Sequence, residues 1–482
     1  RLTTIKGITS KKAMEISAAF RELTGLRRVM EFMARYDLPT TLAMQLYRVY
    51  GGEALTRLKE NPYLLSAQQY GVDFGAMDEI ALSMDFSADD GCRIEAAIEY
   101  ELSYNLNNGH VFLPREKLVA ATAQLIDLPS DAVEIALDEL LRRGVVRQEH
   151  IANVDACYLR AYYEAEVAVA QKLTALRRVE QPPLRRSVEK AIADMEKRQG
   201  IAYAPAQREA VLLAAEEGVV LLTGGPGTGK TTVLRAIIEV FKYLYPAKKI
   251  MLAAPTGRAS RRMAESTGRD DAKTLHSLLG LLGEGGFVRN QEKEPLDADL
   301  IIVDESSMID MWLANHFFSR IRPGTKVILV GDVDQLQSVG AGDVFRELIN
   351  CGRIPVTVLN EIFRQKQDSL IAHNAKAINE DSTNLYYGDD FVFLKCKTQE
   401  EAADIICQHF CEQVAHFGIE HVQILSPFRS EGLTAVDQLN RTIREMVNPI
   451  QDEEIPDLKI GSRFFRENDK VMQTKNNYNI EW

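Results

Sequence analysis

The stretch "LLTGGPGTGKTTVL", residues Leu221 to Leu234, decides the fold. It fits the pattern G-x-x-x-x-G-K-[ST] and lies between an apolar run typical of a buried strand and a segment with helical spacing. Glycines at these positions let backbone N–H groups turn around phosphate oxygens at a helix N-terminus. We therefore expect a nucleotide-binding loop formed by Gly224, Gly225, Pro226, Gly227, Thr228, Gly229, Lys230, Thr231 and Thr232.

An acidic pair ends a later apolar run, "DLIIVDESS" (Asp299 to Ser307). We expect Lys230 to neutralise the β- and γ-phosphates of ATP, and the Thr231 hydroxyl and Asp304 to hold Mg²⁺. Glu305 is then available to orient or deprotonate the attacking water. A surface acidic pair is disfavoured because four apolar residues directly precede Asp304.

A glutamine, Gln335, follows the β-branched run of "VILVGDVDQLQ" (Val327 to Gln337). In an open parallel sheet, ligands bind at the carboxyl ends of the strands, where the glycine loop and the acidic pair also lie. An amide can donate to a phosphate oxygen and accept from the attacking water without adding charge. Gln335 is thus predicted to sense the γ-phosphate, and the loop from Ser338 to Gly342 to shift when that phosphate leaves.

Short β-branched runs alternate with helical segments throughout this part of the chain. The runs are "GVVLLTG", "KIMLAAP", "ADLIIVDE" and "TKVILVGD". This alternation predicts the α/β class, with a parallel sheet and crossover helices. A second α/β block is expected from near Leu359, with strands "FVFLKC" (391–396) and "HVQILSP" (421–427).

The first 190 residues are different, being rich in helices and lacking strand-type runs of more than a few residues. Three similar segments, "IKGITSKKAMEI", "YDLPTTLAMQLYRVYG" and "YGVDFGAMDEIA", each place a tight turn before a helix. They resemble tandem helix-hairpin-helix units, which grip phosphates with turn amides. Asp73 would repel a phosphate, so plain helix-packing modules remain an equal alternative. The later pieces "GHVFLPREKL" and "LDELLRRGVVRQE" read as helix-turn-helix parts of a winged-helix-like domain.

Charge and cysteine content limit the class of protein. The formal net charge of −12 disfavours coating nucleic acid by bulk charge, although a basic channel stays possible. The six cysteines show neither metal-ligand nor disulfide-framework spacing, which favours buried thiols in a cytosolic protein. No apolar run is long enough for a membrane span, and no signal peptide opens the chain. Because the chain begins at Arg1 and ends at Trp482 in mid-pattern, we expect a C-terminally truncated fragment.

Taken in order, the motifs resemble those of superfamily 1 DNA helicases, and most closely the RecD-like branch with an N-terminal helix-hairpin-helix extension. The resemblance is carried by "YAPAQREAV", the glycine loop, "APTGRAS", "KTLHSLLG", "VDESSMID", "GDVDQLQSVGAGDVF" and "LNEIFRQ". "SPFRSEGLTAVDQLN" and "ENDKVMQTKNNY" are also similar to that branch.

The resemblance implies further roles. Gln207 would read the adenine edge, and Arg364 would reach the γ-phosphate from a second RecA-like domain as an arginine finger. Contacts with the DNA backbone are implied for Pro255, Thr256, Arg258 and His276. Residues 281–297 would form a strand-separating β-hairpin, or pin, with a plain loop as the alternative.

Four regions are expected. They are a tandem helix-hairpin-helix-like region (1–88), a helical, winged-helix-like domain with a linker (89–190), a first RecA-like ATPase domain (191–356) and a partial second one (357–482).

The function implied is that of a helicase that hydrolyses ATP, with Mg²⁺, to move along single-stranded DNA and separate forked duplexes. The 5′→3′ direction and a role in repair or recombination also come from the resemblance alone. The alternative is a DNA-stimulated ATPase that remodels protein–DNA complexes without separating strands. With later motifs of the family not found, this chain by itself is expected to bind ATP but to unwind little DNA.

Overall fold

The computed structural model describes residues 9–67, 69–177, 182–225, 227–281, 294–360, 369–450, 457–461 and 463–472. The chain divides into two compact units, Arg1–Gln365 and Lys366–Trp482, which are described separately below. Within the described ranges, no helix combines the length and apolar character that crossing a membrane requires.

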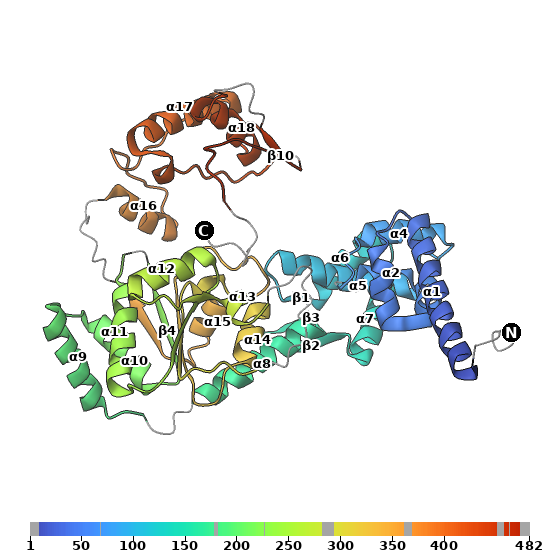
Figure 1. Ribbon diagram of the computed structural model, residues 1–482, viewed down its shortest axis with the longest axis horizontal. Helices are drawn as coiled ribbons and strands as arrows, with labels where there is room; N and C mark the ends of the chain where they lie inside the picture. Colours follow the sequence, from blue (N-terminus) through green and yellow to red (C-terminus); the bar gives the residue numbers. More distant parts are fainter. Residues whose placement is uncertain are drawn as a thin grey trace. The chain divides into compact units, whose positions relative to one another are not determined.

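The first unit begins with a bundle of four α-helices (Figure 1). They are α1 (Ser10–Arg35), α2 (Thr41–Tyr50), α3 (Ala54–Glu60) and α4 (Phe74–Ser83). Their facing side chains include Met33, Leu46 and Met77, which are fully buried. Asp73 caps α4, since its carboxylate accepts a hydrogen bond from the Ala76 amide at 3.3 Å. Asp73 therefore has a structural role at this turn, whether or not the turn binds a phosphate.

A second group of helices follows, together with a small antiparallel sheet of strand order β1-β3-β2. The elements are α5 (Gly91–Asn107), β1 (Phe112–Pro114), α6 (Arg115–Ile126), α7 (Ser130–Arg143), β2 (Val146–Ile151) and β3 (Val154–Leu159). This order of helices followed by a hairpin is that of a winged helix.

Two strands of six residues lie where the sequence was expected to have no strand-type run of that length. Gly144 ends α7 in the left-handed conformation, with φ 71°, so "VVRQE" leaves the helix and enters β2. Ala152 and Asn153, both at positive φ, then close the hairpin. The sequence did not reveal this turn, because the turn lacks the glycine that usually marks a tight hairpin.

A buried ion pair ties the two groups of helices together. The Arg93 guanidinium on α5 binds both carboxylate oxygens of Asp78 on α4, at 2.8 and 2.9 Å. Arg93 also donates to the backbone carbonyls of Ala88 and Ile126, and the Tyr63 hydroxyl donates to Asp78 at 2.7 Å. Every charged group of this cluster thus has a partner inside the protein, as burial demands.

The centre of the unit is a six-stranded parallel sheet of order β6-β5-β7-β8-β4-β9. The strands are β4 (Val219–Gly224), β5 (Ile250–Ala254), β6 (Lys273–Thr274), β7 (Leu300–Val303), β8 (Lys326–Gly331) and β9 (Val356–Leu359). Strands β4, β7 and β8 are buried along their whole length, which explains their unbroken apolar runs. The α/β class with a parallel sheet is confirmed.

Helices cover both faces of this sheet (Figure 1). One face packs against α9 (Arg185–Gln199), α10 (Pro205–Glu216), α11 (Lys230–Leu244) and α12 (Gly257–Thr267). The other packs against α8 (Arg160–Leu176), α13 (Leu275–Leu278), α14 (Met311–Ser319) and α15 (Val344–Asn350). Because β9 pairs with β4 up to Leu359, the first sheet continues past the expected boundary at residue 356.

The second unit contains α16 (Leu370–Asn379), α17 (Gln399–Phe417), α18 (Val436–Val447) and a hairpin of β10 (Leu458–Ile460) with β11 (Arg463–Phe465). The strand predictions for residues 391–396 and 421–427 are wrong: Phe391 makes one isolated bridge, to Gly388, and neither segment is a strand. A parallel strand needs neighbours that pair with it. Apart from that single bridge, no described residue of this unit pairs with these runs, and Val392 and Leu425 stay 66% and 91% exposed.

Candidate nucleotide site

The glycine loop joins the end of β4 to the start of α11, as its sequence pattern predicts. Gly227 and Gly229 have φ of 83° and 85°, a conformation that favours glycine. Gly224 is required for a different reason, since a Cβ there would lie 2.7 Å from the Leu359 carbonyl oxygen on β9. Pro226 lies outside the described residues. The loop thus has the backbone shape in which successive amides can face a phosphate.

Lys230 begins α11, and its ammonium group is directed back over the loop. It donates to the Gly224 carbonyl, and its Nζ lies 3.4 Å from the Gly225 carbonyl oxygen and 3.8 Å from Oδ2 of Asp332. The Thr228 hydroxyl also donates to the Gly225 carbonyl, at 2.9 Å. Thr231 and Thr232 are exposed on the first turn of α11, beside the loop.

The acidic pair follows β7, two strands away from β4 in the sheet. Asp304 accepts a hydrogen bond from the Glu305 amide at 2.9 Å, and Glu305 itself has a left-handed backbone with φ 51°. Burial raises the pKa of Asp304, although Lys230 and Arg262 oppose the shift. Burial also raises the pKa of Glu305, and the neighbouring Asp304 charge adds to that shift. Both carboxyls therefore lie where a cation would be stabilised.

Gln335 follows β8, the strand between β7 and β4. Its side chain is exposed, and its Nε2 lies 3.4 Å from Oδ2 of Asp332. The loop, the acidic pair and Gln335 therefore come from three adjacent strands of one sheet edge. This is the arrangement that the sequence predicts from the carboxyl ends of parallel strands.

Two residues of the site were not among those predicted. Asp332, only 2% exposed, lies between Lys230 and Gln335 and contacts both side chains. Its signal was available, because it ends an apolar strand just as Asp304 does. The positive charge of Arg262 on α12 partly offsets the raised pKa values of Asp304 and Glu305. No motif marked it, since its proximity depends on how α12 packs.

Gln207 lies in the first turn of α10 and is 5% exposed. Its Oε1 accepts a hydrogen bond from the Ala204 amide at 3.1 Å, which caps the helix. The amide oxygen thus has a structural partner. Recognition of adenine by Gln207 stays a prediction.

The residues predicted to contact DNA lie around β5 and β6. Thr256 caps α12 by accepting from the Ala259 amide at 3.2 Å, and Pro255 directly precedes it. Arg258 on α12 and His276 on α13 are exposed. Both helices contact β6, the edge strand of the sheet. Amides at a helix N-terminus and arginine side chains can bind the phosphates of a DNA backbone, so this surface is suited to the predicted contacts. The DNA contacts themselves stay a prediction.

Two predictions fall outside the described residues. They are the arginine finger, Arg364, and most of the proposed pin, since residues 282–293 and 361–368 are not described.

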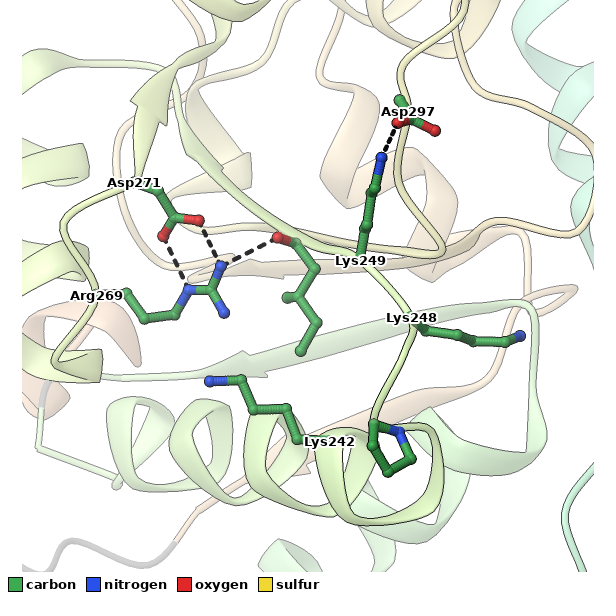
Figure 2. Close-up of a pocket in the computed structure, with 8 residues that line it drawn as sticks. Lys242, Lys248, Lys249, Arg269, Asp271 and Asp297 are labelled. Carbon is green, nitrogen blue, oxygen red and sulfur yellow. Dashed lines mark hydrogen bonds and ion pairs between the residues drawn. The ribbon is translucent and has the colours of Figure 1, made fainter.

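A separate pocket of about 550 Å³ lies at the opposite edge, before the start of β5 (Figure 2). Lysines dominate its rim, but its charges are largely paired: Arg269 binds Asp271 and Lys249 binds Asp297. Arg269 also donates to the Ile250 carbonyl at 3.2 Å. Since phosphate-binding loops follow the carboxyl ends of parallel strands, this pocket is not the nucleotide site.

The protein supplies only some of the ligands that a magnesium ion needs. No group of three His, Cys, Asp or Glu side chains in the described ranges could hold a metal by itself. Mg²⁺ in nucleotide enzymes takes only one or two protein ligands and completes its shell with water and phosphate oxygens. Asp304 and the exposed Thr231 hydroxyl supply hard oxygen donors of that kind.

Two family models match parts of this chain. Residues 207–341 match the family model described as "AAA domain", and residues 22–112 match the model described as "ATP-dependent RecD2 DNA helicase HHH domain". The first match contains the glycine loop, the acidic pair and Gln335. The second begins within α1, covers the rest of the N-terminal bundle and extends through α5 to the start of β1.

Several individual proteins are similar to this chain over part or nearly all of its length. An ATP-dependent RecD2 DNA helicase of Deinococcus radiodurans is 29% identical over 99% of this chain and 65% of its own length. A RecBCD enzyme subunit RecD of Mycobacterium tuberculosis is 35% identical over 42% of this chain and 37% of its own. A crystal structure of the Pif1 helicase from Candida albicans is 25% identical, with a TM-score of 0.30 over 44% of this chain and 55% of that one.

The chain thus spans 65% of the length of the D. radiodurans relative. The two family models occur in the order that the sequence motifs predict, one over the N-terminal helices and one over the sheet. The chain is therefore similar to RecD-type DNA helicases, and its residues 22–112 resemble the helix-hairpin-helix domain of the RecD2 helicases.

Proposed function

We propose that this chain is the ATP-hydrolysing part of a DNA helicase that moves along single-stranded DNA. One observation carries the proposal: the glycine loop, the acidic pair and Gln335 follow three adjacent strands, and Asp332 joins Lys230 to Gln335. This arrangement can bind a nucleoside triphosphate and detect whether its γ-phosphate is present. The name of the D. radiodurans relative, an ATP-dependent RecD2 DNA helicase, supports DNA as the substrate.

The chain's own residues divide the work as follows. Loop amides and Lys230 bind the phosphates, and Thr231 and Asp304 would hold Mg²⁺, which neutralises phosphate charge when bound. Glu305 accepts a proton from the attacking water, and its backbone amide fixes the neighbouring carboxylate of Asp304 at 2.9 Å. Gln335 contacts the γ-phosphate and loses that contact after hydrolysis, so the loop that follows can move.

We propose further that Arg364 completes the γ-phosphate contacts and that Gln207 reads adenine. The DNA backbone would follow the surface around Pro255, Thr256, Arg258 and His276. Movement in the 5′→3′ direction, action on forked DNA and a role in repair or recombination are the finer parts of this proposal.

A forked-duplex assay tests strand separation directly. A protein that contains this chain should release the labelled strand when ATP and Mg²⁺ are present. DNA-stimulated hydrolysis without strand release would instead support a remodelling ATPase. Forks with only a 5′ or only a 3′ single-stranded arm determine the direction in the same experiment.

A further inference from the structure

The loop that follows Gln335 is held at its far end by the N-terminal helices of the same unit. We call residues 333–342 the sensor loop, and residues 108–111, which join α5 to β1, the α5–β1 turn. The backbone amide of Gly342 donates to the carbonyl oxygen of Gly109 at 3.0 Å. A segment of the winged helix thus bonds directly to the segment predicted to respond to the γ-phosphate.

The contact leaves no spare room. Gly342 has φ 95°, and a Cβ at this position would lie 3.0 Å from Cβ of Met311 and 3.3 Å from Cγ1 of Val111. The sensor loop therefore passes between α14 and the α5–β1 turn. Glycine is needed here for both its conformation and its small size.

A second anchor fixes the same end of the loop. The Met311 amide donates to the Ala341 carbonyl at 2.9 Å, and Ala341 is 4% exposed. The Ser338 hydroxyl donates to the carbonyls of Gly340 and Gly342, at 2.9 and 3.0 Å. Residues 338–342 are consequently fixed on α14 and on the N-terminal turn.

The half of the loop next to Gln335 is different. Leu336 is 91% exposed, so its side chain is not held by packing. The other end of the loop is also anchored, since the Arg346 guanidinium donates to the Val333 carbonyl at 2.7 Å and the Asp334 amide donates to the Asp332 carboxylate at 3.1 Å. Gln335 lies between the two anchors, so the position of the Gly342 end limits where Gln335 can lie.

The support beneath the fixed end is itself shared with the N-terminal region. Helix α8 continues directly from β3 of the winged helix and packs along α14. The rings of Tyr162 on α8 and Trp312 on α14 lie 6.1 Å apart. Val111 packs against the same hydrophobic cluster. The winged helix, α14 and the sensor loop therefore form one packed assembly.

We propose that the α5–β1 turn is a positioning element for the sensor loop and couples the N-terminal region to the nucleotide state. The inference rests on the proposed function for its consequence, because Gln335 is the group being positioned. DNA or protein bound by the N-terminal region would alter ATP hydrolysis through this contact. Conversely, loss of the γ-phosphate would alter how the α5–β1 turn binds the sensor loop, since coupling between sites is reciprocal.

Val111→Asp tests the contact, because it places a carboxylate against Met311 and Gly342. Ile135→Asp is the matched control, since this β-branched residue on α7 of the same domain is 73% exposed. Hydrogen exchange of the peptide covering residues 332–343 is compared without nucleotide. We expect at least roughly fivefold faster exchange at Gly342 in Val111→Asp and no change in the control. Unaltered exchange at Gly342 in a folded Val111→Asp protein would overturn the inference.

The same variants are then tested for hydrolysis. We expect Val111→Asp to bind ATP within about twofold of the wild type but to hydrolyse it at least about fivefold more slowly, a loss within the range of allosteric coupling. Val111→Ile should restore the rate. A rate equal to wild type in Val111→Asp would contradict coupling. If the aspartate variant does not fold, Val111→Ala is measured by the same two criteria.

The two experiments separate two failures. A wild-type chain that does not hydrolyse ATP contradicts the proposed function, whereas the nucleotide-free exchange comparison still decides whether the turn holds the loop.

Discussion

Asp332 shares the ammonium group of Lys230 with the carbonyl oxygens of the glycine loop. Its carboxylate oxygen lies 3.8 Å from Nζ of Lys230 and 3.4 Å from Nε2 of Gln335. Because it is 2% exposed, water screens this charge only weakly. An arriving phosphate must therefore compete with Asp332 for Lys230, and success leaves Asp332 with Gln335 and the Asp334 amide as its partners.

This competition gives a prediction for Asp332→Asn. Removing the negative charge should strengthen ADP and ATP binding by about three- to tenfold, roughly 1 kcal/mol. Hydrolysis should nevertheless slow, because Gln335 loses its charged anchor. Fluorescence titration with a labelled nucleotide and steady-state kinetics measure the two effects. The matched control is Asp334→Asn, an exposed neighbour. Weaker nucleotide binding in Asp332→Asn would show that Asp332 supports the fold of the site and does not compete for Lys230.

At the scale of elements, the ion pair between α4 and α5 joins the helix-hairpin-helix region to the winged helix. Burial opposes ionisation of Asp78, yet hydrogen bonds from Arg93 and Tyr63 outweigh it, and the pKa of Asp78 is lowered. Replacing Asp78 leaves the Arg93 guanidinium buried without its counter-charge.

Asp78→Asn should therefore lower the free energy of opening of α4 and α5 by about 3 kcal/mol. Native-state hydrogen exchange of the amides in these helices measures that free energy. Glu79→Gln, on the exposed side of α4, should change it little. A group whose folded pKa is lowered stabilises the fold above its unfolded pKa and stops doing so as the pH falls through its folded pKa. The difference between wild type and Asp78→Asn should accordingly shrink in acid, and a constant difference would contradict this role.

The strands differ in how well the sequence predicted them. Strands β4, β7 and β8 were predictable because each is buried on both faces and so has an unbroken apolar run. The runs at 391–396 and 421–427 have similar composition but do not form strands, because composition does not supply a partner. The hairpin of β2 and β3 was missed for the opposite reason, since its Ala152–Asn153 turn lacks the usual glycine.

For the molecule as a whole, the sequence predicted which strand ends would meet but not which helices would reach them. The site residues come from motifs whose order along the chain fixes their strands, so their convergence follows from parallel topology. Asp332 contacts Lys230 through the packing of β8 beside β4, and Gly342 meets Gly109 through a contact between distant segments. The sequence marks Asp332 as the residue that ends an apolar strand, but it marks neither contact. Such pairings depend on tertiary packing, which motifs do not encode.

The net charge of −12 is also a property of the whole molecule. A protein with this balance does not attract DNA by bulk charge, so binding must rely on a local basic surface such as the exposed arginines of α12. Stimulation by DNA should then weaken as salt increases, with a slope that reflects few phosphate contacts.

The central claim is that the edge formed by β7, β8 and β4 hydrolyses ATP in response to single-stranded DNA. The most direct measurement is the steady-state rate of phosphate release by the wild type and by Lys230→Ala, each with and without single-stranded DNA. We expect DNA to raise the wild-type rate at least several-fold, and Lys230→Ala to show no release above background while keeping its fold by circular dichroism. A wild-type rate that ignores DNA, or hydrolysis that persists in Lys230→Ala, would contradict the account.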